Sequence, residues 1–384
     1  MSEIEFSVVM PCLNEEETLG ICIDKAIGFF RSRNYSYEVI VADNGSSDAS
    51  IDIAAAKGAK VVHITRKGYG CALMGGINAA RGKFVFMGDA DDSYDFANLT
   101  DYVEKLREGN DLIMGNRFRG GIEKNAMPPL HRYLGNPVLT FVGKILFNRS
   151  IGDFHCGLRA FRRQAILDLR LGCPGMEFAS EMVVRASLAD LAIAEVPTTL
   201  KPDGRSRAPH LRSWRDGWRH LKFLLVMRPG VLFIWPGLFI FLAGLIITAV
   251  LSTNPVFIGS VGFDIHTMLY AAGSSVAGLQ IFLTGISTAR IGNRMSILPE
   301  RLTRKFFLFD IEWLLLAGFI ALSASVYLGF NTFSTWEAAG FETLVPREMM
   351  RATIPAIMLF IAGIQMLAMS LAIEAGDIYL QNNK

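Results

Sequence analysis

The chain has 384 residues, of which 51% are hydrophobic and 19% are charged, and its formal net charge is +2. Its mean hydropathy of +0.33 is too high for an ordinary soluble protein and too low for a chain made only of membrane helices, so one soluble and one membrane domain are expected. The small net charge and the lack of a basic arm argue against nucleic-acid binding.

Strand-like and helix-like segments alternate over the first hundred residues. The stretch MSEIEFSVVMPC has acidic residues before a short apolar run, so we expect no signal peptide and a cytoplasmic first domain. Apolar strands are predicted at 6–11, 38–48, 59–65 and 83–92, and helices at 15–32, 48–58 and 70–82. This alternation predicts an α/β fold with a parallel, doubly wound, Rossmann-like sheet.

Three of the predicted strands run directly into polar clusters, at 11–15, 43–48 and 89–92. Ser47 or Asp48 is the expected N-cap of the helix that ends at Gly58. Ligands of open α/β sheets bind at the carboxyl ends of the strands. The three clusters are therefore expected to gather at one ligand-binding edge.

Several motifs of other enzyme classes are missing. Gly68 and Gly70 lack the third glycine of a dinucleotide fingerprint, and the sequence has no Walker motif, no H-E-x-x-H and no G-x-S-x-G. These absences argue against a dehydrogenase, an NTPase, a zinc protease and a serine hydrolase. The cysteines form no C-x-x-C pair, which argues against a disulfide framework or a zinc site and fits a reducing cytoplasm. They are Cys12, Cys22, Cys71, Cys156 and Cys173.

Asp89 and Asp91 follow an apolar strand within the sequence MGDADDS. Two carboxylates about 4 Å apart repel each other by several kcal/mol at an effective dielectric constant near 20, so this strand end needs a cation, a proton or a wide separation of the two groups. Oxygen ligands favour Mg²⁺ or Mn²⁺ shared with substrate phosphates, and such an ion neutralises a departing diphosphate. The alternative is that these aspartates cap a helix near 96–108, a role that suits Asp95 best.

Four stretches together resemble glycosyltransferase family 2 enzymes of the GT-A fold: VVMPCLNEEETL, VIVADNGSSDAS, MGDADDS and GDFHCGLRAFRR. More narrowly, they resemble the polyprenyl-phosphate sugar transferases, the group of the dolichyl-phosphate mannose and glucose synthases. The resemblance covers about residues 5–230. It implies a nucleoside pocket lined by Pro11, Leu13 and Glu15, with Asp43 at the base or ribose.

The same resemblance places Asp89 near the donor and assigns the metal to Asp91, with Asp89 beside it. Asp92 stands where related chains often carry an apolar residue, so only a supporting role is expected for it. The family also has a loop that closes over the donor phosphates. In this sequence that loop corresponds to Gly204, Arg205 and Ser206.

For the acceptor, the resemblance points to Arg117 and Arg132 as a clamp on a lipid phosphate, with Asn136 where such enzymes often have serine. Guanidinium groups suit phosphate oxygens because they bind two of them at once. Arg119 is expected to be an ordinary surface cation. The candidate catalytic residues are Asp153, Asp91 and Arg117.

Asp153 stands at the family's acid/base position. A phosphate monoester is already largely ionised at neutral pH, so a strong base is hardly required, and Asp153 has the alternative of orienting the acceptor or holding an arginine. Glu177 and Glu181 are spaced to share a helix face, where contact with the sugar hydroxyls and a salt-bridged surface are equally good interpretations. His155 is expected to be structural.

The rest of the chain predicts an α-helical membrane domain with four transmembrane helices, at about 231–251, 266–288, 311–330 and 354–373. The alternative for 266–288 is a buried core helix. Lys and Arg residues concentrate before the first span and between the second and third, which predicts that both termini are cytoplasmic.

The domain boundaries predicted from these patterns are 1–210 for the GT-A domain, 211–229 for an interfacial helix and 230–384 for the membrane domain. In the middle segment apolar residues, including Trp214 and Trp218, repeat at helical spacing beside a basic stripe, as in helices that lie on a membrane surface. The alternative is a solvated helix that packs on the soluble domain.

These observations predict inverting transfer of a hexose from a nucleotide sugar to a membrane polyprenyl phosphate. UDP-glucose is the first expected donor, followed by GDP-mannose and UDP-GlcNAc. The alternatives are a membrane polysaccharide synthase, whose usual Q-x-x-R-W motif is missing, and a nucleotide-sugar-binding transport component. A homo-oligomer is an open alternative to a monomer.

Overall fold

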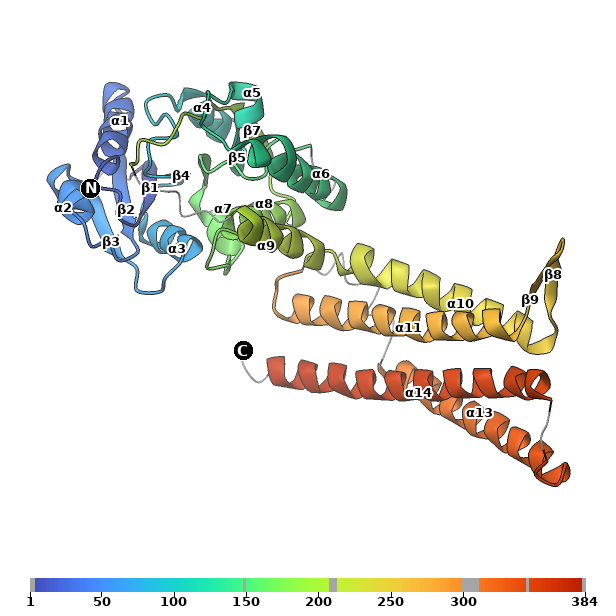
Figure 1. Ribbon diagram of the computed structural model, residues 1–384. Helices are drawn as coiled ribbons and strands as arrows, with labels where there is room; N and C mark the ends of the chain where they lie inside the picture. Colours follow the sequence, from blue (N-terminus) through green and yellow to red (C-terminus); the bar gives the residue numbers. More distant parts are fainter. Residues whose placement is uncertain (1–3, 148–149, 207–212, 299–310, 343–344, 382–384) are drawn as a thin grey trace. The chain divides into compact units, whose positions relative to one another are not determined.

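The computed structural model describes residues 4–147, 150–206, 213–298, 311–342 and 345–381. The chain forms two compact units, with the boundary in the sequence between Met227 and Arg228. The N-terminal unit is built of strands and helices, and the C-terminal unit is almost entirely helical (Figure 1).

The N-terminal unit begins with the predicted alternation of strands and helices and ends with α9. Its strands are β1 (Phe6–Cys12), β2 (Tyr37–Asp43), β3 (Lys60–His63), β4 (Phe84–Met87), β5 (Leu112–Asn116), β6 (Arg159–Arg162) and β7 (Ile193–Pro197). Its helices are α1 (Leu19–Ser32), α2 (Ser50–Ala56), α3 (Tyr69–Ala79), α4 (Thr100–Arg107), α5 (Arg117–Gly120), η1 (His131–Gly135), α6 (Asn136–Phe147), α7 (Arg163–Asp168), α8 (Phe178–Leu188) and α9 (Ser213–Val226).

The seven strands form one mixed sheet in the order β3-β2-β1-β4-β6-β5-β7. All neighbouring pairs are parallel except those of β6, which runs antiparallel to both β4 and β5. The prediction of a parallel sheet is therefore confirmed for β1 to β4, but it did not include the antiparallel strand β6. Because β6 runs in the opposite direction, the residues that precede it lie at the same edge as the residues that follow β4, where Met87 pairs with Arg159.

Helices cover both faces of the sheet (Figure 1). Alternate residues of β1 point to opposite faces, so Val8 packs in one core with α1 and α4, and Val9 packs in the other with α3 and α8. The helix α3 lies very close to the sheet, because a Cβ on Gly76 would come within 2.4 Å of Val9 Cγ1. A side chain at position 76 would push α3 away from β1.

The described residues of the C-terminal unit form four helices long and apolar enough to cross a membrane, over Gly230–Thr253, Ile265–Arg294, Ile311–Ala338 and Pro346–Leu380. They correspond to the four predicted spans. They comprise η2 (Gly230–Ile234), α10 (Trp235–Thr253), α11 (Ile265–Arg294), α13 (Ile311–Ala338) and α14 (Pro346–Gln381), with a hairpin of β8 (Val256–Ile258) and β9 (Val261–Phe263) between α10 and α11.

The membrane helices pack through small residues. A Cβ on Gly237 of α10 would come within 2.5 Å of the backbone nitrogen of Phe282, and one on Gly278 of α11 within 2.3 Å of that of Phe241. Small residues of this kind let two helix backbones approach closely in lipid. Charged pairs also join the helices, since Arg294 of α11 lies 3.0 Å from Asp377 of α14.

Several predicted boundaries need correction. The helix expected at 15–32 begins at Leu19, and the one expected at 48–58 is α2, which has no side-chain N-cap bond. Asp48 accepts instead from Ser50 N in a turn before α2. The helix expected near 96–108 begins only at Thr100, and the side chain of Asp95 accepts from Ala97 N rather than capping it.

Candidate functional site

The three predicted polar clusters follow β1 and the two strands that pair with it in parallel, β2 and β4. Their carboxyl ends therefore share one edge of the sheet. Asp43 ends β2, Asp89 follows β4 after a single glycine, and the turn after β1 passes through Asn14 with a φ of 58°. Asparagine is among the few residues that tolerate this left-handed conformation, which directs the chain toward Glu15.

Asp89 and Asp91 lie at this edge in different environments. The Tyr69 hydroxyl donates to Asp89 Oδ1 at 2.9 Å, and Ser93 donates its backbone N–H and its hydroxyl to Asp91 Oδ1 at 3.1 and 2.6 Å. Burial and the charge of Asp91 raise the pKa of Asp89 to about 6. A carboxylate pair that repels in this way favours a bound cation.

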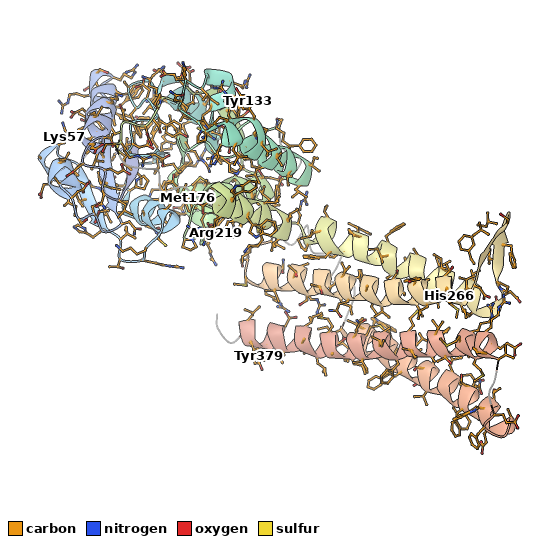
Figure 2. The ribbon with its side chains drawn as sticks, in the orientation of Figure 1. Lys57, Tyr133, Met176, Arg219, His266 and Tyr379 are labelled. Atoms are coloured by element: carbon orange, nitrogen blue, oxygen red, sulfur yellow. The ribbon has the colours of Figure 1, made fainter. Side chains whose placement is uncertain are left out.

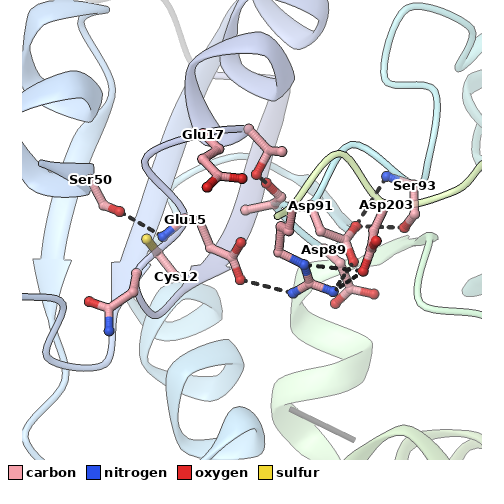
Figure 3. A network of polar contacts seen from close by, with 12 residues as sticks. Cys12, Glu15, Glu17, Ser50, Asp89, Asp91, Ser93 and Asp203 are labelled. Carbon is pink, nitrogen blue, oxygen red and sulfur yellow. Dashed lines mark hydrogen bonds and ion pairs between the residues drawn. The ribbon is translucent and has the colours of Figure 1, made fainter. Parts of the chain in front are cut away.

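Arg205 brings a positive charge into this acidic edge. Its Nη1 lies 3.1 Å from Glu15 Oε1, and its Nη2 lies 3.0 Å from Asp91 Oδ2 and 2.7 Å from Asp203 Oδ2. Figure 3 shows the side chains of Glu15, Asp91 and Asp203 gathered around this guanidinium, with dashed lines for the contacts. The loop around Arg205 is held by Gly204 N, which donates to Asp91 O, and by Ser206, which donates to Glu17.

The nucleoside side of the predicted site is organised around Asp43. Its carboxylate accepts from Gly45 N at 3.1 Å and Ser46 N at 2.9 Å, and His63 Nδ1 lies 3.3 Å away. Burial opposes ionisation of Asp43, but these hydrogen bonds outweigh it and lower its pKa. Asp43 is therefore ionised and shapes the loop after β2. Pro11 lies in β1 and Leu13 in the turn after it, and both are half-buried.

Arg117 and Asp153 form a buried ion pair at the same edge. Arg117 Nε and Nη2 donate to Asp153 Oδ2 and Oδ1 at 2.7 and 2.9 Å, and His155 N also donates to Oδ1, at 3.1 Å. Burial would raise the pKa of Asp153, but the charge and hydrogen bonds of Arg117 lower it. With no solvent exposure and both oxygens engaged, Asp153 is placed to hold Arg117 rather than to take a proton from an acceptor.

The remaining predicted acceptor residues come from η1 and α6. Arg132 belongs to η1 and its guanidinium lies 5.6 Å from the ring of Tyr133, while Asn136 opens α6 and donates to Met127 Sδ at 3.4 Å. Burial and the charge of Arg117 lower the pKa of His131, the first residue of η1. The other cation of this region, Arg119, is exposed, and within the described part of the chain its side chain forms no ion pair with a carboxylate of the site.

Three acidic residues considered from the sequence, Glu181, Glu177 and Asp92, lie in other environments. Glu181 is buried in α8 and accepts from Gly172 N and Cys173 N, which ties down the preceding loop and leaves it no exposed oxygen face for a sugar. Glu177 is the N-terminal boundary residue of α8. Asp92 lies 2.6 Å from Lys25 Nζ and has a φ of 60°.

His155 takes part in a buried polar network that reaches α9. Ser180 Oγ lies 3.2 Å from His155 Nε2 and 2.7 Å from His220 Nδ1. His220 belongs to α9, so this hydrogen bond attaches α9 to α8 inside the N-terminal unit. Leu224, one turn after His220, is fully buried, whereas Trp214 and Trp218 are exposed.

This network predicts acid sensitivity. Burial lowers the pKa of His220 from 6.5 to about 4, so between these pH values the unfolded chain binds more protons than the folded one. The free energy of unfolding is therefore expected to fall as the pH falls from 6.5 to about 4, by about 3 kcal/mol in total. Thermal unfolding of the protein and of a His220→Gln variant checks this, because glutamine still pairs with Ser180 but does not titrate. Equal acid sensitivity of the two proteins would contradict the assignment.

Four residues with contacts in the site were not predicted from the sequence. Tyr69 contacts Asp89, Asp203 contacts Arg205, Lys25 contacts Asp92, and Glu195 accepts from Gly152 N and Asp153 N. Only Asp203 carried a signal, since it stands two residues before an arginine in the loop already suspected of closing over the donor. The others lie on elements that approach the edge only in the folded protein.

Within the described part of the chain, no three His, Cys, Asp or Glu residues gather as a metal-ligand group. The two adjacent carboxylates of Asp89 and Asp91 still suit a divalent ion that takes its other ligands from a substrate diphosphate and water. The raised pKa of Asp89, which follows from burial and repulsion by Asp91, fits the same interpretation.

Comparison with known proteins relates both units to one family. Residues 7–170 match the family described as glycosyl transferase family 2, and residues 286–376 match the glycosyltransferase family 2 C-terminal transmembrane region. The low-salt glycan biosynthesis hexosyltransferase Agl6 of Haloferax volcanii is 35% identical over 362 residues, which are 94% of this chain and 86% of that protein.

Two further proteins of Haloferax volcanii match about half of this chain. The dolichyl-phosphate hexose transferase is 30% identical over 50% of this chain and 81% of its own length. The glycosyltransferase AglJ is 29% identical over 55% of this chain and 67% of its own length.

Proposed function

The chain belongs to glycosyltransferase family 2, and we propose that it transfers a hexose from a nucleotide sugar to the phosphate of a membrane polyprenyl phosphate. The observation that carries this proposal is the meeting of two kinds of site at one sheet edge. The carboxylates of Asp89 and Asp91, which follow β4, suit a donor diphosphate with its cation, and the buried pair of Arg117 and Asp153 lies after β5 and before β6, whose ends share that edge.

The divalent cofactor is proposed to be Mg²⁺ or Mn²⁺, held by Asp91 with Asp89 beside it. When bound, such an ion would neutralise the negative charge of the nucleoside diphosphate. Glu15, Asp43, Pro11 and Leu13 would border the nucleoside. Arg205 and Ser206, in the loop over this edge, would contact the donor phosphates.

Arg117 and Arg132 are proposed to bind the acceptor phosphate, with Asn136 beside them. Arg117 keeps a fixed orientation because Asp153 engages its Nε and Nη2, and the third guanidinium nitrogen remains for a phosphate oxygen. A phosphate oxygen then attacks the anomeric carbon while the bond to the nucleoside diphosphate breaks. One displacement of this kind inverts the configuration, and the ionised phosphate needs no base.

The donor is proposed to be UDP-glucose, with GDP-mannose and UDP-GlcNAc as the next choices. A radiolabelled nucleotide sugar, a short polyprenyl phosphate and Mg²⁺ or Mn²⁺ test the proposal with the full-length protein in detergent. The expected product is a radiolabelled lipid that organic solvent extracts and mild acid cleaves. If none of the three donors yields such a lipid, the proposed function is wrong.

The catalytic unit is proposed to face the cytoplasm, with residues 1–210 as the GT-A domain, 230–384 as the membrane domain and 211–229 as an interfacial helix. The charge pattern of the loops supports this orientation. Exposed apolar side chains support the interfacial role: Trp214 and Trp218 of α9 are 79% and 61% exposed, and Phe141 and Ile145 of α6 are each 63% exposed. Tyr133 of η1 is exposed as well (Figure 2).

Replacing both Trp214 and Trp218 by serine is expected to raise the KM for a long-chain acceptor in lipid bilayers by about thirtyfold. Each indole that enters the interface stabilises the bound state by about 1 kcal/mol through its apolar surface. The KM is measured with the long-chain acceptor in lipid nanodiscs and with a short-chain acceptor in detergent. Only the KM in nanodiscs should rise, because only there does the protein contact a lipid surface. Ile21→Ser, which removes an exposed apolar residue of α1, is the control. An equal loss in both assays would show a general defect instead.

A further inference from the structure

The guanidinium of Arg205 lies where the proposed function expects a divalent cation. It contacts Asp91 Oδ2 at 3.0 Å, Glu15 Oε1 at 3.1 Å and Asp203 Oδ2 at 2.7 Å, and its side chain is only 12% exposed. One monovalent cation therefore neutralises part of the charge that three carboxylates bring to the sheet edge (Figure 3).

The two oxygens of Asp91 are engaged by different partners. Oδ1 accepts from the backbone and hydroxyl of Ser93, which fixes the orientation of the carboxylate. Oδ2 faces Arg205. A divalent ion binds carboxylate oxygen at about 2.1 Å, and two cations so close to one oxygen would repel each other strongly. Arg205 and a divalent ion therefore cannot both use Asp91 Oδ2 in this arrangement.

The loop that carries Arg205 has anchors of its own. Gly204 N donates to the carbonyl oxygen of Asp91 at 2.9 Å, and Ser206 donates its backbone N–H to Glu17 at 2.7 Å. These contacts hold the backbone on both sides of Arg205 without using its side chain. The guanidinium can thus exchange partners by rotation of its side chain while the loop stays in place.

We propose that Arg205 is an internal cation that occupies the metal position in the donor-free protein, competes with the divalent ion for Asp91, and moves to the donor diphosphate when the ion and nucleotide bind together. This inference rests on the proposed function for the identity of the incoming ion and diphosphate. Because linkage is reciprocal, a diphosphate that draws Arg205 away from Asp91 also tightens the binding of the ion. The ion alone binds weakly, and the ion with its nucleotide binds well.

Binding of Mn²⁺ in the absence of any nucleotide tests the competition. The full-length protein, Arg205→Gln and Arg119→Gln are titrated with Mn²⁺, and the free aqueous ion is counted from its electron paramagnetic resonance signal. Loss of the competitor is expected to lower the Kd for Mn²⁺ by about tenfold in Arg205→Gln, in the range typical of coupled sites. Arg119→Gln removes an exposed arginine and should leave the Kd unchanged. A Kd in Arg205→Gln equal to or higher than that of the unaltered protein overturns the inference.

Chemical rescue gives a second measurement on the same position. In Arg205→Ala, millimolar guanidinium ion is expected to enter the vacated place and raise the Kd for Mn²⁺ again, whereas it should have no effect on the unaltered protein. Guanidinium that leaves the Kd of Arg205→Ala unchanged argues against competition at Asp91. Neither measurement uses a sugar or a lipid, so they remain valid if the proposed acceptor is wrong. If the unaltered protein transfers sugar as proposed but Arg205→Gln binds Mn²⁺ with the same Kd as the unaltered protein, this inference is wrong and the proposed function stands.

Discussion

Replacing Asp91 by asparagine is expected to lower the rate of sugar transfer by about 10²–10³-fold, the usual effect of removing one electrostatic contact with developing charge. Asparagine has nearly the same shape as aspartate and can still accept from Ser93, so the loop after β4 should keep its structure. The charge that would hold a cation beside the departing diphosphate is lost. The rate of formation of labelled lipid at saturating donor and acceptor measures the effect.

The neighbouring residue offers a matched control. Asp92 pairs with Lys25 and has a φ of 60°, a conformation that asparagine also adopts readily. Asp92→Asn should therefore retain most of the activity, although it removes the same charge one residue further along the chain. Full activity in Asp91→Asn, or equal losses in the two variants, would disprove the assignment of Asp91.

The second large effect is expected for Asp153→Asn. This change leaves the buried guanidinium of Arg117 without its anionic partner, and removing one partner of a buried ion pair costs about 3–5 kcal/mol of folding stability. Arg117 also loses its fixed orientation, so the KM for the acceptor phosphate should rise more than the KM for the nucleotide sugar. Thermal unfolding and initial rates over a range of both substrates measure the two effects.

The surface pair of Arg162 and Asp111, 3.3 Å apart, provides the comparison for Asp153. Asp111→Asn should cost less than about 1 kcal/mol, because exposed ion pairs contribute little. The pH dependence separates a positioning role from a basic one. If Asp153 were a general base, the transfer rate of the unaltered enzyme would rise with pH, whereas the rate of Asp153→Asn would not change over the same pH range. Parallel profiles are expected if Asp153 only holds Arg117.

The sequence was sufficient to predict the first half of the sheet and the four membrane helices. Strands β1 to β4 are apolar runs separated by helices, and that pattern leaves few alternatives. The strand β6 could not be predicted in the same way, since its four residues, RAFR, place arginine at both ends. Arg159 is nevertheless fully buried, because its guanidinium donates to the carbonyl oxygens of Phe154, Cys156 and Ala179.

The membrane helices also extend beyond their predicted ends. The last one was expected at 354–373 and α14 runs from Pro346 to Gln381, because a helix continues past the apolar part of its sequence when polar residues follow without a helix breaker. The hairpin of β8 and β9 was not predicted from the sequence. Its strands have only three residues each, which is too short for a periodic pattern.

For the candidate site, what the sequence could predict depended on strand direction. Asp89 and Asp91 follow a parallel strand, so their place at the edge follows from the fold class alone. Glu181 illustrates the opposite case. Its spacing from Glu177 indicates a shared helix face but not the direction of that face, and Glu181 points to the loop at residues 172–173. Tyr69 required the folded chain, because it opens the helix α3 and does not belong to a strand end.

The position of β6 has a consequence for folding. In the sheet it is the strand that joins the block β3-β2-β1-β4 to the pair β5-β7, although it follows β4 by about seventy residues in the chain and pairs Phe84 with Arg162. Pairings between residues so distant in sequence slow folding, and until they form the edges of both blocks stay open to other chains. A truncated chain that ends before β6 is thus expected to aggregate rather than to yield a soluble half-domain.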